Sequence, residues 1–220
     1  MDFEIGKIQT VIGTGEEGYT GDGGPALEAT IGEAYGCSFD VEGNLYICDG
    51  RNHTVRRIDK DSQVITTVAG TGEAGYSGDG GPATQATMDN LYSLTVDTNG
   101  DIYIVDRFNA AIRKVEAATG IITTVAGTGE AGYSGDGKPA KSALLRDPFM
   151  CCFDNKGNIF IAEAKNHCVR RVDVYTNLIT TIVGNGDPGY SGDGDLATTA
   201  TMNEPYSLAI DPTNDDIYIV

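Results

Sequence analysis

Short apolar runs bounded by Gly, Asn and Asp follow one another along the chain. In one stretch they predict four strands, at residues 92–97, 101–105, 111–115 and 121–125. No segment has the apolar periodicity of a helix, and the recurring link Gly-Asp-Gly-Gly-Pro is incompatible with one. The pattern therefore predicts an all-β chain built from four-stranded antiparallel units.

The same unit recurs at a constant spacing of 57 residues. The motif Gly-Tyr-(Ser/Thr)-Gly-Asp-Gly occurs four times, with its tyrosine at Tyr19, Tyr76, Tyr133 and Tyr190. After Asp211 one residue is inserted, so residues 217–220 align with residues 102–105. Four-stranded units copied head to tail, each followed by a Gly-rich link, are typical of the blades of a β-propeller.

Two further motifs recur within the units. The pair Asn-His stands at residues 52–53 and 166–167, and Asp-x-x-Gly-Asn-(Leu/Ile)-(Tyr/Phe)-Ile spans residues 40–47 and 154–161. With these motifs the chain resembles the NHL-repeat family of β-propellers over nearly its whole length. The resemblance implies a propeller that serves mostly as a binding or interaction module and occasionally in an enzyme, because one fold hosts many functions.

The repeat divides a single propeller domain, residues 1–220, into blades and links. Complete blades are predicted at residues 33–70, 90–127 and 147–184. Inter-blade links are predicted at residues 14–32, 71–89, 128–146 and 185–203. Incomplete blades are predicted at both ends, with residues 1–13 as an outer strand and residues 204–220 as the first two strands.

A blade made from the two chain ends would lack its third strand. The resulting open edge would be prone to pair with other strands. Propellers of the family that the chain resembles commonly have six blades. We therefore expect the chain to be part of a larger, six-bladed propeller, or its open edge to pair with another chain.

The residue just before the first strand of each unit is an oxygen donor, and these residues are Glu33, Asn90, Asp147 and Glu204. In a propeller such positions converge at the mouth of the central channel. Hard cations such as Ca²⁺ prefer carboxylate and amide oxygens. The arrangement resembles the central metal site of the gluconolactonase and fluorophosphatase propellers, which implies a divalent cation; the alternative is a solvated polar rim.

Aromatic residues stand two positions further on, at Tyr35, Tyr92, Phe149 and Tyr206. Rings with a polar tip suit a ligand pocket, although packing between neighbouring blades is an equal alternative. His53 and His167 are candidates for catalytic bases or metal ligands. Because Ala110 takes their place in the middle unit, the alternative is that they stabilise the turn.

Charged residues also recur with the unit. The aspartates of the Gly-Asp-Gly loops are expected to close the loop by bonding its own backbone, and they are Asp22, Asp79, Asp136 and Asp193. The basic residues of the third strand are expected to pair with the abundant acids, and they are Arg56, Arg57, Arg113, Lys114, Arg170 and Arg171.

The composition limits the kinds of partner that the chain is expected to bind. The chain has 32 acidic and 15 basic side chains, and a net charge of −17 argues against nucleic acid. Its apolar stretches are too short to span a membrane, and its start lacks the pattern of a signal segment. Five cysteines, an odd number in mostly apolar surroundings, favour free thiols and a reducing, cytoplasmic location.

Two hypotheses for function follow. The first is a binding scaffold that recognises a protein, a peptide, a small molecule or a glycan on the face carrying the long links. The second is a divalent-cation-dependent hydrolase or lactonase, in which the ion polarises a carbonyl or phosphoryl oxygen. The sequence favours the first, because it contains no clear nucleophile or base and its units are closely alike.

Overall fold

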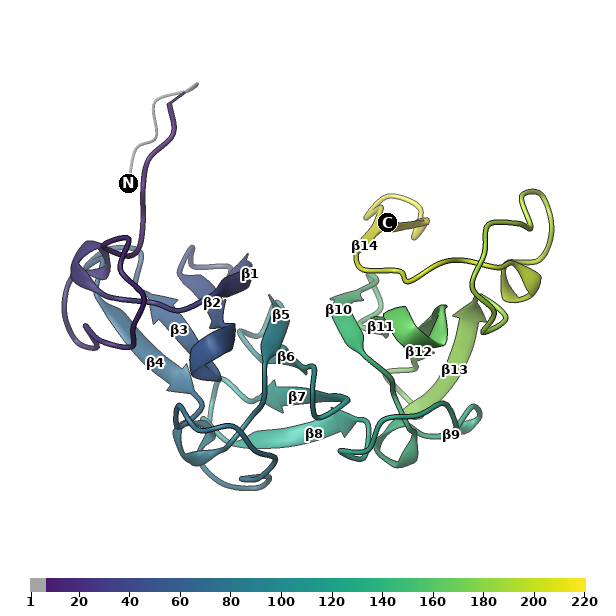
Figure 1. Ribbon diagram of the computed structural model, residues 1–220, viewed down its shortest axis with the longest axis horizontal. Helices are drawn as coiled ribbons and strands as arrows, with labels where there is room; N and C mark the ends of the chain where they lie inside the picture. The colour runs from purple at the N-terminus through teal and green to yellow at the C-terminus, as the bar shows by residue number, and fades with distance from the viewer. Residues whose placement is uncertain (1–6) are drawn as a thin grey trace. The chain divides into compact units, whose positions relative to one another are not determined.

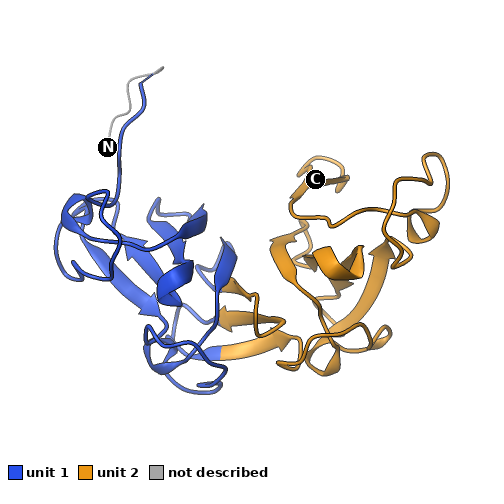
Figure 2. Ribbon diagram, viewed as in Figure 1, with its two compact units in different colours: residues 1–102, 115–122 blue, residues 103–114, 123–220 orange. Residues whose placement is uncertain are grey.

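The computed structural model describes residues 7–220, and these form two compact units (Figures 1 and 2). Unit 1 comprises residues up to 102 together with residues 115–122. Unit 2 comprises residues 103–114 and 123–220. Both units consist of β-sheet and long links, and the helices are single turns of 3₁₀ type.

The first sheet of unit 1 has the order β1-β2-β3-β4, with each strand antiparallel to the next. The strands are β1 (Ala34–Phe39), β2 (Leu45–Asp49), β3 (Thr54–Ile58) and β4 (Ile65–Ala69). Asp40 closes the turn between β1 and β2, because its Oδ1 accepts the Asn44 N–H at 2.8 Å. Gly43 supplies the positive φ of 91° that this turn requires. The core of this sheet contains Ala26, Ala29, Ile47, Ile58 and Ile65.

The second sheet has the order β5-β6-β7-β8. Its strands are β5 (Leu91–Val96), β6 (Ile102–Asp106), β7 (Ala111–Val115) and β8 (Ile122–Ala126). Each of these bounds lies within one residue of the bounds predicted from the apolar runs.

Unit 2 contains a third sheet and a smaller pair of strands. The sheet consists of β10 (Pro148–Phe153), β11 (Ile159–Glu163), β12 (Cys168–Val172) and β13 (Leu178–Val183), with β9 (Lys138–Pro139) at its edge. The pair consists of β14 (Leu208–Ile210) and β15 (Ile217–Ile219), which are antiparallel.

Each of the three links that precede a complete blade pairs with the outer strand of that blade, a feature that the sequence did not predict. In unit 2 this pairing joins Leu178 of β13 to Pro139 of β9. In unit 1 the Gly23 N–H donates to the Ile65 carbonyl at 2.8 Å. Proline is tolerated in such a segment because it lies at the edge of the sheet. The link therefore covers a strand edge that would otherwise be open.

Single 3₁₀ turns occur in the links and in the loops between second and third strands. Those in the links are η1 (Ala26–Glu28), η3 (Ala83–Gln85), η4 (Ala140–Ser142) and η6 (Ala197–Thr199). Those between second and third strands are η2 (Gly50–Asn52) and η5 (Ala164–Asn166). Within residues 7–220 no helix has the length and apolarity needed to cross a membrane.

The chain's beginning differs from the prediction of an outer strand over residues 1–13. Residues 7–13 form no strand, and residues 1–6 lie outside the described residues. The Gly13 N–H instead donates to the Ala26 carbonyl at 3.0 Å. The physical reason is pairing, because an outer strand needs a third strand beside it and none of the described strands pairs with residues 7–13.

Candidate functional site

The residue before the first strand adopts a left-handed backbone in three of the four repeats, with φ of 50° at Asn90, 52° at Asp147 and 48° at Glu204. Asn and Asp adopt this conformation more readily than Glu does. Two of these residues are each held by a histidine from the preceding loop. The Glu204 N–H donates to His167 Nδ1, and the Asn90 N–H donates to His53 Nδ1, both at 3.1 Å.

These contacts assign the two histidines a positioning role. Because Nδ1 accepts a hydrogen bond, the neutral ring carries its proton on Nε2. Both histidines also have positive φ and end the turns η2 and η5. The turn-stabilising alternative fits these observations, while catalysis by His53 or His167 stays a prediction.

In unit 1 the predicted aromatic residues pack on each other. The rings of Tyr35 and Tyr92 are stacked, with centroids 4.9 Å apart and planes at 17°. The Tyr35 hydroxyl donates to the Glu33 carboxylate. Gly50 makes room for this arrangement, because a Cβ there would lie 2.6 Å from Tyr35 Cδ2. Tyr35 remains 43% exposed, so packing and an accessible ring occur together.

In unit 2 the corresponding aromatic residues meet edge to face. The centroids of Phe149 and Tyr206 are 4.5 Å apart. Phe149 is buried, with the Arg107 guanidinium 4.1 Å from its centroid. Tyr206 is 45% exposed, and its hydroxyl donates to Glu204 Oε2 at 2.7 Å. The accessible aromatic surface of this site therefore belongs to Tyr206 and not to Phe149.

Three of the four predicted metal ligands already have a donor or a cation beside them. Tyr35 donates to Glu33 as above, Arg107 Nε donates to Asp147 Oδ1 at 2.6 Å, and Lys165 Nζ pairs with Glu204. Lys165 and the Tyr206 hydroxyl hold the pKa of Glu204 below its usual value. The fourth candidate, Asn90, has a buried Oδ1 without a hydrogen-bond partner.

Glu33 and Asn90 belong to unit 1, whereas Asp147 and Glu204 belong to unit 2. Across the described part of the chain, no cluster of three or more His, Cys, Asp and Glu side chains is arranged to hold a metal. The oxygen donors suit a hard cation chemically. A cation at these four residues stays a prediction.

Unit 1 also contains a buried polar network around Arg56, which has no exposed surface. Arg56 Nη2 donates to Asp22 Oδ1 at 2.7 Å, and the Tyr19 ring lies 5.0 Å from the guanidinium. The Asn52 amide donates to both carboxylate oxygens of Asp49 at 2.9 Å. The network ties the Gly-Tyr-Thr-Gly-Asp-Gly link to the blade.

Unit 2 repeats this network around Arg170. Arg170 Nη2 donates to Asp136 Oδ1 at 2.6 Å, and Arg170 Nη1 lies 3.5 Å from Glu163 Oε1. Asn166 donates to Glu163 Oε2 at 2.5 Å, as Asn52 does to Asp49. Burial raises the pKa of Glu163 to about 7, against the opposing effect of Arg170.

The prediction that Asp22 and Asp136 bond their own loop backbone was wrong. Each binds the third-strand arginine and a distant backbone N–H, that of Thr67 for Asp22 and that of Thr181 for Asp136, both at 3.0 Å. The loop geometry leaves these carboxylates facing the blade, where a buried guanidinium needs an anion. Ion pairing of Arg56 and Arg170, as predicted, is confirmed.

One of the cysteines, Cys168, lies next to this network, because it is paired with Glu163 across strands β11 and β12. All five are free, and Cys37 is exposed although its surroundings in the sequence are apolar. Burial raises the pKa of the Cys151 and Cys168 thiols above the usual value. These two thiols therefore stay protonated and are poor nucleophiles.

Sequence reasoning missed Gly50, Arg107 and Lys165, which shape the site. Each lies in the loop between a second and a third strand, at a position that differs between otherwise similar repeats. This difference between the repeats is the sequence signal that could have identified the three residues. The residues at these positions provide the positive charge beside Asp147 and Glu204.

Four-stranded sheets repeated along the chain, joined by links that lead back to the next first strand, define a β-propeller. Solved structures agree. An auxiliary nutrient binding protein from Bacteroides thetaiotaomicron superposes with a TM-score of 0.66 at 20% identity, over 92% of this chain and 52% of that chain. The predicted all-β propeller class is confirmed.

The relatives identify the kind of propeller. Mouse teneurin-1 is 31% identical over 237 residues, which cover 94% of this chain and 8% of teneurin-1. Human NHL repeat-containing protein 2 is 24% identical over 144 residues, which cover 63% of this chain and 20% of that protein. No family model matches the chain. These relatives confirm the resemblance to NHL-repeat propellers, and the chain spans only a small part of their length.

Proposed function

We propose that the chain is a binding scaffold that recognises a glycan, with one subsite at Tyr35 in unit 1 and one at Tyr206 in unit 2. The observation that carries the proposal is a shared arrangement. In both places a half-exposed tyrosine donates its hydroxyl hydrogen to a carboxylate two residues before it, Glu33 or Glu204.

This arrangement matches the chemistry of a sugar. The flat apolar face of a sugar ring packs on an aromatic ring, and its hydroxyl groups donate to neighbouring carboxylates. The hydrogen bond between each tyrosine and its carboxylate fixes both groups before a ligand arrives, which lowers the entropic cost of binding. A net charge of −17 favours neutral or amine-bearing sugars over acidic ones.

Two further observations support binding over catalysis. A solved structure with the same fold is an auxiliary nutrient binding protein, so this architecture is compatible with ligand capture. In addition, the two candidate bases, His53 and His167, each use Nδ1 to accept a hydrogen bond from the backbone of the next repeat.

The proposal is tested with an oligosaccharide panel followed by calorimetric titration of the best ligand. The double variant Tyr35→Ala/Tyr206→Ala is expected to weaken binding by about tenfold or more, because aromatic anchors carry much of the energy of such sites. The control is Tyr175→Ala, a tyrosine that is 83% exposed on a turn of unit 2, which should leave the affinity unchanged. Failure of the chain to bind any sugar, or equal binding by the double variant, would overturn the proposal.

A cation-dependent hydrolase is the second candidate. Its specific support is the buried, unpartnered Asn90 Oδ1, an oxygen of the kind that a hard cation takes. It ranks second because Arg107 and Lys165 already neutralise Asp147 and Glu204.

A further inference from the structure

Unit 2 contains a pocket of about 440 Å³ where the third link meets the outer strand β8 of the preceding blade. It is lined by Val125 of β8, by Pro139, Ala140 and Lys141 of the link, and by Asn177, which precedes β13. These residues belong to two blades that are complete in the sequence and to the link that joins them. A pocket of this size can hold a small molecule.

Backbone hydrogen bonds fix the lining of this pocket. The Ala140 N–H donates to the Asn177 carbonyl at 2.9 Å, and the Ala140 carbonyl accepts the Gly127 N–H at 3.0 Å. Asn177 has a left-handed backbone with φ of 57°, which asparagine adopts more readily than most residues do. Ala140 is buried, whereas Lys141 and Asn177 are exposed. The pocket therefore combines a fixed backbone frame with two exposed polar side chains.

The adjacent edge strand β9 leaves few backbone groups for a further strand. The Lys138 N–H donates to the Gly135 carbonyl at 2.9 Å. Pro139 has no N–H, and its carbonyl accepts the Ser142 hydroxyl at 2.7 Å. An extended peptide that adds to a sheet edge depends on main-chain hydrogen bonds. We therefore expect an occupant of the pocket to be held by side chains.

Lys141 places a positive charge beside the apolar side chains of Val125 and Pro139. In unit 2 Lys165 and Arg170 pair with carboxylates, whereas within residues 7–220 no carboxylate pairs with Lys141. Its counterparts in the other three links are uncharged, and they are Leu27, Thr84 and Thr198. An unpaired cation beside an apolar surface favours an anion that has an apolar body.

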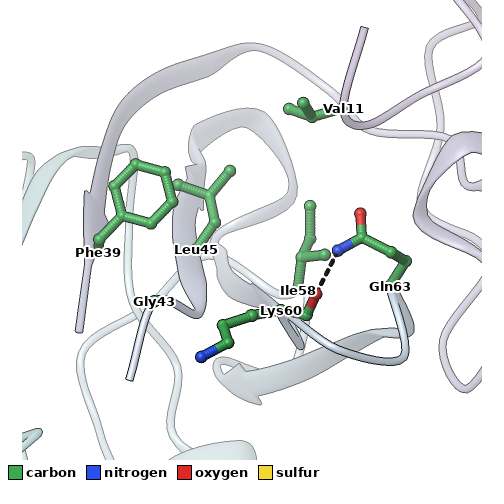
Figure 3. Close-up of a pocket in the computed structure, with 7 residues that line it drawn as sticks. All are labelled: Val11, Phe39, Gly43, Leu45, Ile58, Lys60 and Gln63. Carbon is green, nitrogen blue, oxygen red and sulfur yellow. Dashed lines mark hydrogen bonds between the residues drawn. The ribbon is translucent and has the colours of Figure 1, made fainter. Parts of the chain in front are cut away.

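The corresponding place in unit 1 shows what is particular to Asn177. Figure 3 shows Val11 and Gln63, which occupy the positions of Val125 and Asn177 two repeats earlier. The Gln63 side chain bonds to its own turn, because its amide donates to the Lys60 carbonyl at 2.7 Å. Asn177 is one methylene shorter, and in the described part of the chain no hydrogen bond engages its amide. The Asn177 amide is therefore available to a ligand.

We propose that this pocket of unit 2 binds a small carboxylate with an aliphatic body. The aliphatic part packs against Val125 and Pro139. The carboxylate accepts hydrogen bonds from the Lys141 ammonium and from the Asn177 amide, and the former is strengthened by charge. Because Tyr206 does not line the pocket, the proposal does not depend on glycan recognition.

A nuclear magnetic resonance titration with octanoate tests the proposal, and the methyl signals of Val125 and Ala140 are its readout. Acetate lacks the apolar body and octan-1-ol lacks the charge, so each should bind about tenfold more weakly than octanoate, or weaker still. Lys141→Thr should weaken octanoate binding by about tenfold, because the carboxylate loses its cation. Threonine stands at the equivalent positions Thr84 and Thr198, so this variant should keep the fold.

The matched control is Lys138→Ala. Lys138 precedes Pro139 on β9, and adjacent residues of a strand face opposite sides, so this variant removes the same charge without touching the pocket. Its affinity for octanoate should be unchanged. Tyr206→Ala should also bind octanoate normally, which separates this site from the proposed glycan subsites.

Three results would overturn the proposal. The first is the absence of any shift of the methyl signals at millimolar octanoate. The second is equal binding of octan-1-ol, which would make the pocket an apolar surface without anion recognition. The third is an equal loss of affinity in Lys138→Ala and Lys141→Thr, which would assign the effect to overall charge. An acidic peptide that shifts the signals where octanoate does not would likewise contradict the proposal, and would assign the pocket to a protein partner.

Discussion

The loop between the second and third strands has the same framework in units 1 and 2 but different side chains. Asn52 and Asn166 each donate to the carboxylate that ends the second strand. The two residues before them differ, since residues 50–51 are Gly-Arg in unit 1 and residues 164–165 are Ala-Lys in unit 2. The asparagine holds the framework in both units, while the residues before it differ in size and in the acidic partner that they reach.

The consequence is a different charge at each carboxylate. Arg51 pairs with Glu17 at 2.6 Å, in the link, whereas Lys165 pairs with the site residue Glu204 and lowers its pKa. Glu33 instead accepts the Tyr35 hydroxyl. The repeat thus keeps a constant scaffold and varies the surroundings of the carboxylate through two positions of one short loop. Each subsite can therefore differ in charge without a change in fold.

The largest effect is expected from the part that the two units share, the buried arginine. Arg170→Met should lower the free energy of unfolding by about 3–5 kcal/mol, because Glu163 and Asp136 lose the cation that compensates them. Urea denaturation measures the change.

The matched control is the neighbouring Arg171→Met. Arg171 is partly exposed and pairs with Asp173 at 2.9 Å, so its loss should cost less than about 1 kcal/mol. Similar losses for the two variants would show that the buried network is not what holds the links.

A smaller effect is expected where the two units differ, at Gly50. Gly50→Ala introduces a Cβ 2.6 Å from Tyr35 Cδ2 and 2.7 Å from the Leu91 carbonyl oxygen. Overpacking of this kind costs about 1–3 kcal/mol and should displace the Tyr35 ring. Denaturation measures the stability, and the quenching of tyrosine fluorescence by added iodide measures the exposure of the ring.

Unit 2 supplies the comparison for this variant, because Ala164 already occupies the equivalent position. Ala164→Gly should cost about 1–2 kcal/mol, through backbone entropy and the loss of one buried methyl group. If Gly50→Ala lowers the stability no more than Ala164→Gly does, the space left by the missing Cβ of Gly50 does not determine the position of the Tyr35 ring.

Much of the fold was predictable because it depends on local pattern and on repetition. The strands of the second sheet were placed within one residue, since apolar runs and turn residues act over short stretches. The absence of an outer strand at residues 7–13 was not predictable in this way. A strand exists only where a partner strand lies beside it, and apolar pattern does not report that partner.

The sequence names the residues of the candidate site but not their contacts. Glu33, Tyr35, Tyr206 and Glu204 are candidates from spacing alone. The partner of Asp22 was not, because Arg56 lies 34 residues further along the chain and meets it only after the sheet has formed. The left-handed backbone of Glu204 was equally hidden, since glutamate gives no local signal for it and the His167 contact is tertiary.

The smallest effect is expected from calcium, and it compares the two units directly. If a cation binds Glu33, Asn90, Asp147 and Glu204, its addition at tenfold excess over the dissociation constant stabilises the chain by about 1.4 kcal/mol. The melting temperature should then rise by a few degrees, and Glu33→Gln and Glu204→Gln should each abolish the rise, although the former lies in unit 1 and the latter in unit 2. Glu116→Gln, on a turn outside the site, is the control. A melting temperature that does not change up to millimolar calcium, in the chain and in both variants, would leave these four residues as a solvated rim, with Lys165 as the cation that Glu204 uses.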